Sequence, residues 1–205
     1  MHKQWSRFLI VSGGSIGMRH AQNLSALYPE AEILILHLKK TASADAGASD
    51  DGYSHIYDID DAIGAKPEAA FICAPASAHI SVALVLCAAS IPLFIEKPIA
   101  DKLEAFQKLS QAARASNVPI AVGYHLRFER CFAALQSALA EKLIGEVLYV
   151  HAEVGQYLPH WRPQTNYRHS VSARKELGGG ALLELSHELD YIVTLFGMPN
   201  MISAF

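Results

Sequence analysis

Short apolar runs alternate with longer amphipathic segments through the first 124 residues of the chain. The runs have the length and continuous hydrophobicity of buried parallel strands, and they cover residues 32–37, 69–73, 93–96 and 120–124. The segments between them follow a helical period and cover residues 16–28, 76–90 and 101–117. Asp101 is placed as the N-cap of the last helix, and Pro119 follows its end. The alternation predicts an α/β domain of the Rossmann type, with a doubly wound parallel sheet, over residues 1–124.

The turn after the first apolar run carries the strongest functional signal. Residues 8–20, FLIVSGGSIGMRH, predict a strand, a glycine-rich turn and a helix in series, a geometry that points backbone N–H groups at a diphosphate. Gly14 and Gly17 occupy the second and third glycine positions of the GxGxxG pattern, whereas Ser12 stands at the first. Gly13, beside Ser12, is the candidate source of flexibility for the turn. We therefore expect NAD or NADP as the cofactor. The residues expected to bind its pyrophosphate are Ser12, Gly13, Gly14, Ser15, Ile16 and Gly17.

The end of the second predicted strand bears on the choice of cofactor. A dinucleotide fold usually has an Asp or Glu there that accepts a hydrogen bond from the ribose 2′-OH. This chain has His37, followed by Lys39 and Lys40. The two ammonium groups predict that NADP binds at least as well as NAD. The alternative is that both lysines belong to a solvated strand end.

Two further segments follow predicted strands and are placed to line the same site. Ala74 and Pro75 follow the strand 69–73, and Glu96 and Lys97 end the strand 93–96. Both lie at the carboxyl edge, where open α/β sheets bind ligands. The Lys97 ammonium is suited to binding a substrate hydroxyl, with Glu96 orienting it. The alternative is an ordinary strand exit.

Residues 125–205 predict a second, α+β domain. The segment 146–154 alternates apolar and polar residues and predicts an antiparallel strand. In the helix predicted over 180–196, one face carries Glu184, His187, Glu188 and Tyr191. The opposite face carries Leu185, Leu189, Ile192, Val193 and Phe196. An imidazole one turn from a carboxylate is typical of a general base.

Aromatic and arginine side chains gather in the segment 157–174. Tyr157, Trp161 and Arg162 are suited to stacking on sugars and to holding a carboxylate or phosphate. They are therefore candidates for substrate binding. The alternative is a structured surface loop or a contact between subunits.

Composition excludes several other classes of protein. The chain has a net charge of −3 and a pI near 6.3, which leave no basic field for nucleic acid. Its 51% hydrophobic and 18% charged residues are the balance of a globular enzyme. No apolar run is long enough for a signal peptide or a membrane span, so we expect a cytoplasmic protein. The cysteines Cys73, Cys87 and Cys131 lie in apolar stretches, as expected of buried reduced thiols.

A set of short motifs extends from the glycine turn to the last predicted helix. It comprises the turn with Arg19 and His20, Cys73-Ala74-Pro75 followed by His79, Glu96-Lys97-Pro98, and segments 123–128, 155–159, 161–163 and 178–180 with Glu184 and His187. Together these motifs resemble the Gfo/Idh/MocA oxidoreductases over nearly the whole chain. The Glu-Lys-Pro sequence is the most specific of them.

The resemblance implies NAD or NADP in the N-terminal domain and a sugar, inositol or related polyol as the substrate. It implies catalytic roles for Lys97, His187 and Glu184. It adds His79 to the residues expected to bind the cofactor. It also adds Tyr124, Arg127 and Tyr191 to those expected to bind the substrate. The chain departs from the family in three respects: Glu184 and His187 are three residues apart where many members have four, the acid is Glu instead of Asp, and His125 replaces a frequent Asn. Details at 155–163, 178–180 and 186–191 resemble the branch associated with surface-polysaccharide gene clusters.

The second domain of that family is usually a large open sheet, whereas this chain stops at Phe205. We therefore expect a truncated second domain and an isolated chain that is poorly soluble or associates, with homo-oligomers when the full domain is present. The main alternative to a dehydrogenase is a non-catalytic protein that binds a cofactor or a partner. A metal site is a third, since E-x-x-H recurs on helices of carboxylate metal proteins. Its ligands would be Glu184 and His187 with His151, His160 or His169; only one such motif is present, so no metal is expected.

Overall fold

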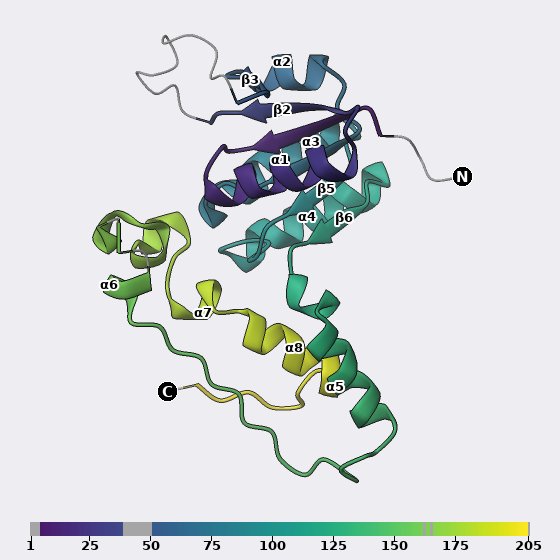
Figure 1. The fold of residues 1–205 in the computed structure, drawn as a ribbon, viewed down its shortest axis with the longest axis vertical. Coiled ribbons are helices and arrows are strands. Elements are labelled where there is room, and N and C mark those ends of the chain that lie inside the picture. The colour runs from purple at the N-terminus through teal and green to yellow at the C-terminus, as the bar shows by residue number, and fades with distance from the viewer. Residues whose placement is uncertain (1–4, 39–50, 162, 165, 205) are drawn as a thin grey trace. The chain divides into compact units, whose positions relative to one another are not determined.

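The computed structural model describes residues 5–38, 51–161, 163–164 and 166–204 (Figure 1). The chain divides into two compact units. The first comprises Met1–Gly123 with Glu176–Gly178, and the second comprises Tyr124–Lys175 with Gly179–Phe205.

Six parallel strands form the sheet of the first unit, in the order β3-β2-β1-β4-β5-β6. Their bounds are β1 Arg7–Val11, β2 Glu32–Leu36, β3 Ser54–Ile56, β4 Ala69–Ile72, β5 Leu93–Ile95 and β6 Ile120–Val122. At the carboxyl end of β1, Val11 lies between Leu36 of β2 and Ile72 of β4. The strand order reverses between β1 and β4, which is where open α/β sheets bind their ligands.

Helices cover both faces of this sheet (Figure 1). The helix α1 (Ser15–Leu27) packs on the face that carries Phe8 and Ile10. The opposite face carries Leu9 and Val11, against which pack α2 (Ile59–Gly64), α3 (Ala76–Ala88) and α4 (Leu103–Ser116). Because successive side chains of a strand point to opposite faces, β1 contributes to both hydrophobic layers. Its residues from Leu9 to Val11 are fully buried.

The structure confirms the doubly wound parallel sheet. The predicted strands are present to within one or two residues at their ends. The sequence patterns missed β3, which is three residues long, and α2, which is six. The latter is capped by Asp58, whose carboxylate accepts the N–H groups of Asp60 and Asp61.

The predicted N-cap of α4 is wrong. The helix begins at Leu103, and its N-cap is Lys102, which makes no side-chain capping hydrogen bond. Ile99 and Ala100 pack on the hydrophobic core before the helix begins. Their burial fixes the course of the chain past Asp101, so the carboxylate is one residue too early to cap.

The second unit is helical in its described residues. Its α-helices are α5 (Arg130–Ala140), α6 (Leu158–Trp161), α7 (Ala181–Glu184) and α8 (His187–Phe196). Its 3₁₀ helices are η2 (His125–Phe128), η3 (Tyr167–His169) and η4 (Val171–Ala173), and η5 (Lys175–Leu177) spans a boundary between the units.

The strand predicted over 146–154 is wrong. These residues lie outside any helix or strand, and the side chain of Leu148 is 90% exposed. A strand needs ladder hydrogen bonds from a neighbouring strand. None of the described segments of the second unit forms one, so the alternating pattern has no sheet to join.

The single helix predicted over 180–196 is also wrong, because it is divided into α7 and α8. Helix α7 ends at Glu184 with Leu185 as its C-cap, at φ −105° and ψ 35°, and α8 begins at His187. The apolar face expected to be buried is partly exposed, at Leu189 and Phe196. None of the residues of α8 is buried, so the apolar pattern alone did not fix a continuous helix here.

Two of the three cysteines lie where the sequence predicts. Cys73 and Cys87 are buried free thiols, and burial raises the pKa of Cys73 to about 12. Cys131, on α5, is exposed, so its expected burial is wrong. Within the described part of the chain, the helices are too short or too polar to cross a lipid bilayer.

Candidate functional site

The glycine turn of the first unit joins β1 to α1 at the centre of the sheet. Ser12 has φ 79°, in the left-handed region that favours glycine, and its N–H donates to the Leu36 carbonyl at 2.8 Å. The turn is therefore carried by Ser12 itself, and the expectation that Gly13 supplies this flexibility is wrong. A Cβ on Gly17 would lie 2.0 Å from the Ser12 carbonyl oxygen. Only glycine allows this approach of the helix to the turn.

The beginning of α1 is suited to an anion. Gly14 is its N-cap and makes no side-chain capping hydrogen bond, and the first turn contains no acidic residue. The first N–H groups of a helix have no partner within the helix, and the helix dipole favours negative charge there. A Cβ on Gly14 would meet only the Ser12 hydroxyl, at 3.9 Å. The turn thus has room and donors for a pyrophosphate, which Ser15 and Ile16 would also approach.

His37 lies beside this turn, just after β2. Its N–H donates to the Ile56 carbonyl at 2.9 Å, and its ring would lie 3.3 Å from a Cβ placed on Gly13. His37 is therefore part of the wall of the turn. Lys39 and Lys40, expected next to it, lie outside the described residues.

His79 holds two loops together from within the protein. It lies on α3, which follows Ala74 and the N-cap Pro75, and it is 1% exposed. Its Nε2 lies 2.7 Å from the Ala74 carbonyl and its Nδ1 lies 2.9 Å from the Pro98 carbonyl. Burial lowers the pKa of His79, against the raising effect of these carbonyls. A neutral ring with one N–H donates to one of the two. The geometry supports a positioning role for His79 beside the cofactor loops.

Glu96 follows β5 and forms a pair with a histidine from α1. The Nε2 atom of His20 lies 2.7 Å from Glu96 Oε1, and both side chains are largely buried. Burial alone would raise the pKa of Glu96, but the hydrogen bond and charge of His20, with the N–H and charge of Lys97, hold it below its ordinary value. A Cβ on Gly123 would meet the Glu96 carboxylate at 3.1 Å. Glu96 is thus fixed as a carboxylate, and it anchors the strand end that Lys97 follows.

A polar cluster in the second unit joins η2 to α8. The ring of His187 makes edge contacts with the rings of Tyr124 and His125, at centroid distances of 5.6 and 4.9 Å. The hydroxyl of Tyr124 donates to Ser186 Oγ at 3.3 Å. The structure thus brings Tyr124 and His187 together, as candidates for the substrate site.

Arg127 belongs to the same cluster through Asp190. Its Nε donates to Asp190 Oδ2 at 2.8 Å and its Nη2 donates to Oδ1, a bidentate pair that raises the pKa of Arg127. The arginine is half exposed, whereas the Asp190 side chain is 8% exposed. Sequence reasoning missed Asp190. Its spacing of one turn from His187 was a visible signal for a shared helix face.

Glu184 lies apart from the expected arrangement. It ends α7 and accepts the Ser172 hydroxyl at 3.1 Å, whereas His187 begins α8. The prediction that this carboxylate and the imidazole of His187 lie one turn apart on one continuous helix is therefore wrong. The physical reason is the change of backbone direction at Leu185.

The remaining predicted substrate residues lie on separate elements of the second unit. Tyr157, just before α6, is exposed and makes an edge contact with His160 at 4.7 Å. Trp161 ends α6, and Tyr191 is a partly exposed residue of α8. Arg162 lies outside the described residues. Within the described residues, no group of three or more His, Cys, Asp and Glu is placed to hold a metal ion.

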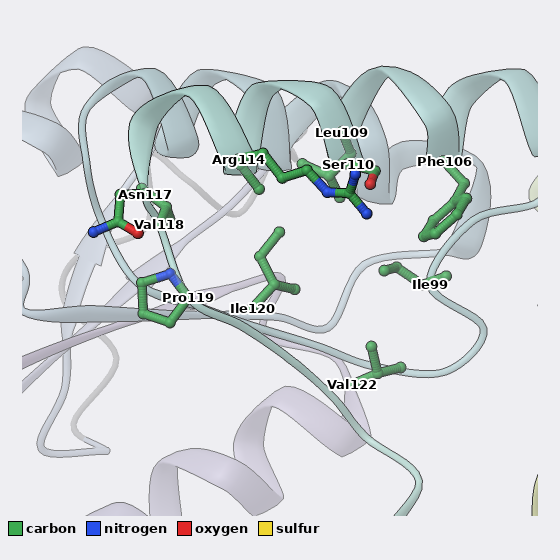
Figure 2. A pocket seen from close by; sticks show the side chains of 11 residues that line it. Ile99, Phe106, Leu109, Ser110, Arg114, Asn117, Val118, Pro119, Ile120 and Val122 are labelled. Atoms are coloured by element: carbon green, nitrogen blue, oxygen red, sulfur yellow. The ribbon is translucent and has the colours of Figure 1, made fainter.

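A separate hollow of about 450 Å³ lies between α4 and β6 (Figure 2). Apolar side chains such as Phe106, Leu109 and Ile120 line it, with Arg114 as its charged group. The edge strand β6 is separated from β1 by β4 and β5. This hollow is therefore not the dinucleotide site.

Comparisons with known proteins agree with this geometry. A model described as the oxidoreductase family with an NAD-binding Rossmann fold matches residues 6–124. A model described as the GFO/IDH/MocA C-terminal domain matches residues 132–205. Inositol 2-dehydrogenase of Paracoccus denitrificans is 29% identical over 147 residues, which are 70% of this chain and 44% of that protein. The chain spans about half the length of the curated relatives it matches.

Two solved structures show the same fold. Scyllo-inositol dehydrogenase from Lactobacillus casei, with bound NAD(H) and scyllo-inositol, has a TM-score of 0.61 and 24% identity over 70% of this chain and 43% of that one. The WlbA dehydrogenase from Bordetella pertussis, in complex with NADH and UDP-GlcNAcA, has a TM-score of 0.74 and 19% identity over 96% of this chain and 57% of that one. At these identities the likeness is one of fold.

Proposed function

Because the chain belongs to the GFO/IDH/MocA family of oxidoreductases, we propose that it is an NAD-dependent dehydrogenase or reductase acting on a CH–OH group of a sugar-like or polyol substrate. The observation that carries the proposal is the glycine turn. Ser12 in the left-handed conformation, the close approach at Gly17 and the open N-terminus of α1 together form a cradle for a pyrophosphate.

The first unit supplies the cofactor residues. Ser12 to Gly17 hold the pyrophosphate, and His37, Ala74 and Pro75 lie along the rest of the dinucleotide. When bound, the nicotinamide supplies the acceptor or donor of a hydride. Glu96, kept ionised by His20, fixes the strand end from which Lys97 projects. The Lys97 ammonium then binds and polarises the substrate oxygen.

The second unit supplies the proton-transfer and substrate residues. His187 takes the hydroxyl proton during oxidation and returns it during reduction, since an imidazole titrates near neutral pH. Tyr124 orients this ring by its edge contact, and Arg127 binds polar substituents of the substrate. Glu184, which accepts the Ser172 hydroxyl, supports this region.

The proposed substrate class is supported by the relatives and by the exposed aromatic side chains of the second unit. Relatives include inositol dehydrogenases, and a structural neighbour holds UDP-GlcNAcA. The exposed aromatic side chains of Tyr157 and Trp161 are suited to stacking on a sugar ring. A role in surface-polysaccharide sugar metabolism is the finer form of this proposal.

Single-turnover hydride transfer with Lys97→Ala and His187→Ala tests these roles. Each variant should react about 10² to 10⁴ times more slowly, the usual worth of a positioned acid or base, and should keep its affinity for NAD. The matched control is His151→Ala, which removes an exposed imidazole of the second unit that has no proposed role in substrate binding. If His187→Ala reacts at the parent rate with the parent pH dependence, the base is another group, with Tyr124 or Tyr191 next to be replaced.

A non-catalytic cofactor-binding protein is the second candidate. The observation that favours it is the separation of Glu184 and His187 onto two helices. It predicts dinucleotide binding with no hydride transfer to any ketone or alcohol of an inositol or nucleotide-sugar panel. Turnover of one member of that panel would exclude it.

A further inference from the structure

Three side chains form a hydrogen-bonded chain at the edge of the first unit's sheet. The Nε2 atom of His37, after β2, lies 2.8 Å from Nδ1 of His55 on β3. The Nε2 atom of His55 lies 3.1 and 3.2 Å from the two carboxylate oxygens of Asp51. The order Asp51, His55, His37 therefore leads from a carboxylate toward the glycine turn.

The carboxylate fixes the tautomer of both rings. An ionised carboxylate only accepts, so His55 donates to Asp51 from its Nε2–H, and its Nδ1 is an acceptor. The partner of that acceptor is His37, which must donate from its own Nε2–H. A neutral His37 ring then carries a lone pair on Nδ1. The hydrogen-bonded series therefore ends in an acceptor, His37 Nδ1. It lies just after β2, where this protein lacks the carboxylate that dinucleotide folds usually have.

This acceptor is held at the place where dinucleotide folds recognise the adenosine ribose. The His37 ring would lie 3.3 Å, at Cε1, from a Cβ on Gly13, and 3.9 Å from it at Nδ1. Its other face lies nearly parallel to the ring of Tyr57, with centroids 5.0 Å apart. The ring is therefore fixed on two sides, and its Nδ1 edge adjoins the glycine turn.

Among the described residues, the titratable groups that face His37 all come from the segment that contains β3. His55 belongs to β3, Asp51 precedes that strand and Tyr57 follows it; the glycine turn and β2 bring apolar or backbone groups. Burial and the charge of His55 lower the pKa of His37 below its ordinary 6.5, with Asp51 opposing them. The ring is neutral at physiological pH, as the tautomer assignment requires.

We propose that the chain Asp51–His55–His37 replaces the usual carboxylate by presenting His37 Nδ1 as the acceptor for the ribose 2′-OH, and so selects NAD over NADP. This inference rests on the proposed function, since it concerns the same cofactor. A 2′-phosphate has no proton to give to Nδ1 and meets a lone pair there. The structure thus favours the opposite cofactor to the one that Lys39 and Lys40 predict.

Protonation should reverse this preference. As the pH falls through the pKa of His37, Nδ1 gains a proton and changes from an acceptor to a positively charged donor. NAD then loses its acceptor, whereas a 2′-phosphate gains a charged partner. The ratio of NADP to NAD affinity is therefore expected to rise on acidification.

Equilibrium titration of the whole chain with NAD and with NADP tests the proposal, at about pH 8 and at about pH 5, the latter well below the ordinary histidine pKa because the pKa of His37 is lowered. At the higher pH the parent should bind NAD about tenfold more tightly than NADP, and the preference should shrink at the lower pH. His37→Ala should weaken NAD binding by roughly three- to tenfold, the worth of one hydrogen bond. His37→Asp should keep the NAD preference and lose its dependence on pH, since a carboxyl titrates near 4.

Asp51→Asn tests the tautomer argument with little change of shape. His55 Nε2 lies within 3.1 and 3.2 Å of the two Asp51 oxygens, so the variant replaces a group that only accepts by an amide that can accept from this nitrogen or donate to it. The direction of the donors is then no longer fixed, His37 Nδ1 is no longer held as an acceptor, and the preference for NAD over NADP should shrink. The control Asp60→Asn removes the same charge from exposed α2 and should leave both affinities unchanged.

The outcomes separate this inference from the proposed function. Binding of neither cofactor by the parent would overturn the proposed function and this inference with it. NAD affinity that is unchanged in His37→Ala, a parent that prefers NADP at about pH 8, or Asp51→Asn that behaves as Asp60→Asn would overturn this inference alone.

Discussion

Ser12 shows how one side chain can occupy a position that the GxGxxG pattern gives to glycine. Its φ of 79° is available to an L-residue at a modest cost, and its backbone is held by the hydrogen bond to Leu36. The sequence predicted the turn, and it predicted the close approach at Gly17, because those features depend on adjacent residues. It did not show that Ser12 would take the strained conformation, since that depends on contacts with β2.

Ser12→Gly should raise the free energy of unfolding by about 1 kcal/mol, because glycine adopts this conformation without strain. Chemical denaturation of the first unit, followed through Trp5, measures the effect. Ser15→Gly is the control: it places glycine in the first turn of α1, at a helical φ, and should destabilise by up to about 1 kcal/mol. A loss of stability in both variants would show that Ser12 is not strained.

Gly14 and Gly17 should respond differently to added side chains. Gly14→Val meets open space in the folded chain, so its stability should be near that of the parent, while NAD affinity falls at least tenfold, or about 1.4 kcal/mol. Gly17→Ala places its Cβ against the Ser12 carbonyl and should destabilise by about 1 to 3 kcal/mol. Isothermal titration and denaturation curves give both numbers. Undiminished NAD binding by Gly14→Val would show that the pyrophosphate does not bind at this turn.

At the scale of secondary-structure elements, prediction succeeded where burial is two-sided. β1, β2, β4 and β5 are continuous apolar runs because helices cover both faces of their sheet. Prediction failed over 146–154, where the pattern alternates, and at Leu185, where it is amphipathic. In both places the described residues provide little packing for the apolar side chains. The candidate site divides in the same way: the glycine turn, Lys97 and His187 were identified from local motifs. His20, His55 and Asp190 act through partners 18 or more residues away, so their contacts could not be read from the sequence.

The contact of η2 with α8 provides a prediction at this scale. Arg127→Met removes both hydrogen bonds to Asp190 and leaves its nearly buried carboxylate without the guanidinium. The second unit should lose about 1 kcal/mol of stability, a low value because the arginine is half exposed to screening solvent. Trp161 fluorescence in a Trp5→Phe background reports unfolding of this unit. Arg130→Met, an exposed arginine of α5, is the control, and an equal effect in both variants would assign no special role to the pair.

At the scale of the whole molecule, the proposed chemistry is divided between the two units. The first contains the glycine turn, the His20–Glu96 pair and Lys97, and the second contains His187, Tyr124 and the Arg127–Asp190 pair. Neither set is sufficient by itself, because a dehydrogenase needs a bound dinucleotide together with groups that bind the substrate oxygen and move its proton. The account therefore requires that one chain both bind NAD(H) and exchange a hydride with a substrate.

Transfer of an isotopic label tests this requirement most directly. The chain is incubated with NADH carrying deuterium at nicotinamide C4 on either face, together with keto-inositol or a keto nucleotide-sugar, and the products are examined by mass spectrometry. We expect an alcohol with deuterium on the former carbonyl carbon from one of the two labelled cofactors, and about 10² to 10⁴ times less of it from Lys97→Ala over the same period. NADH that binds to the chain but leaves every ketone unlabelled would contradict it.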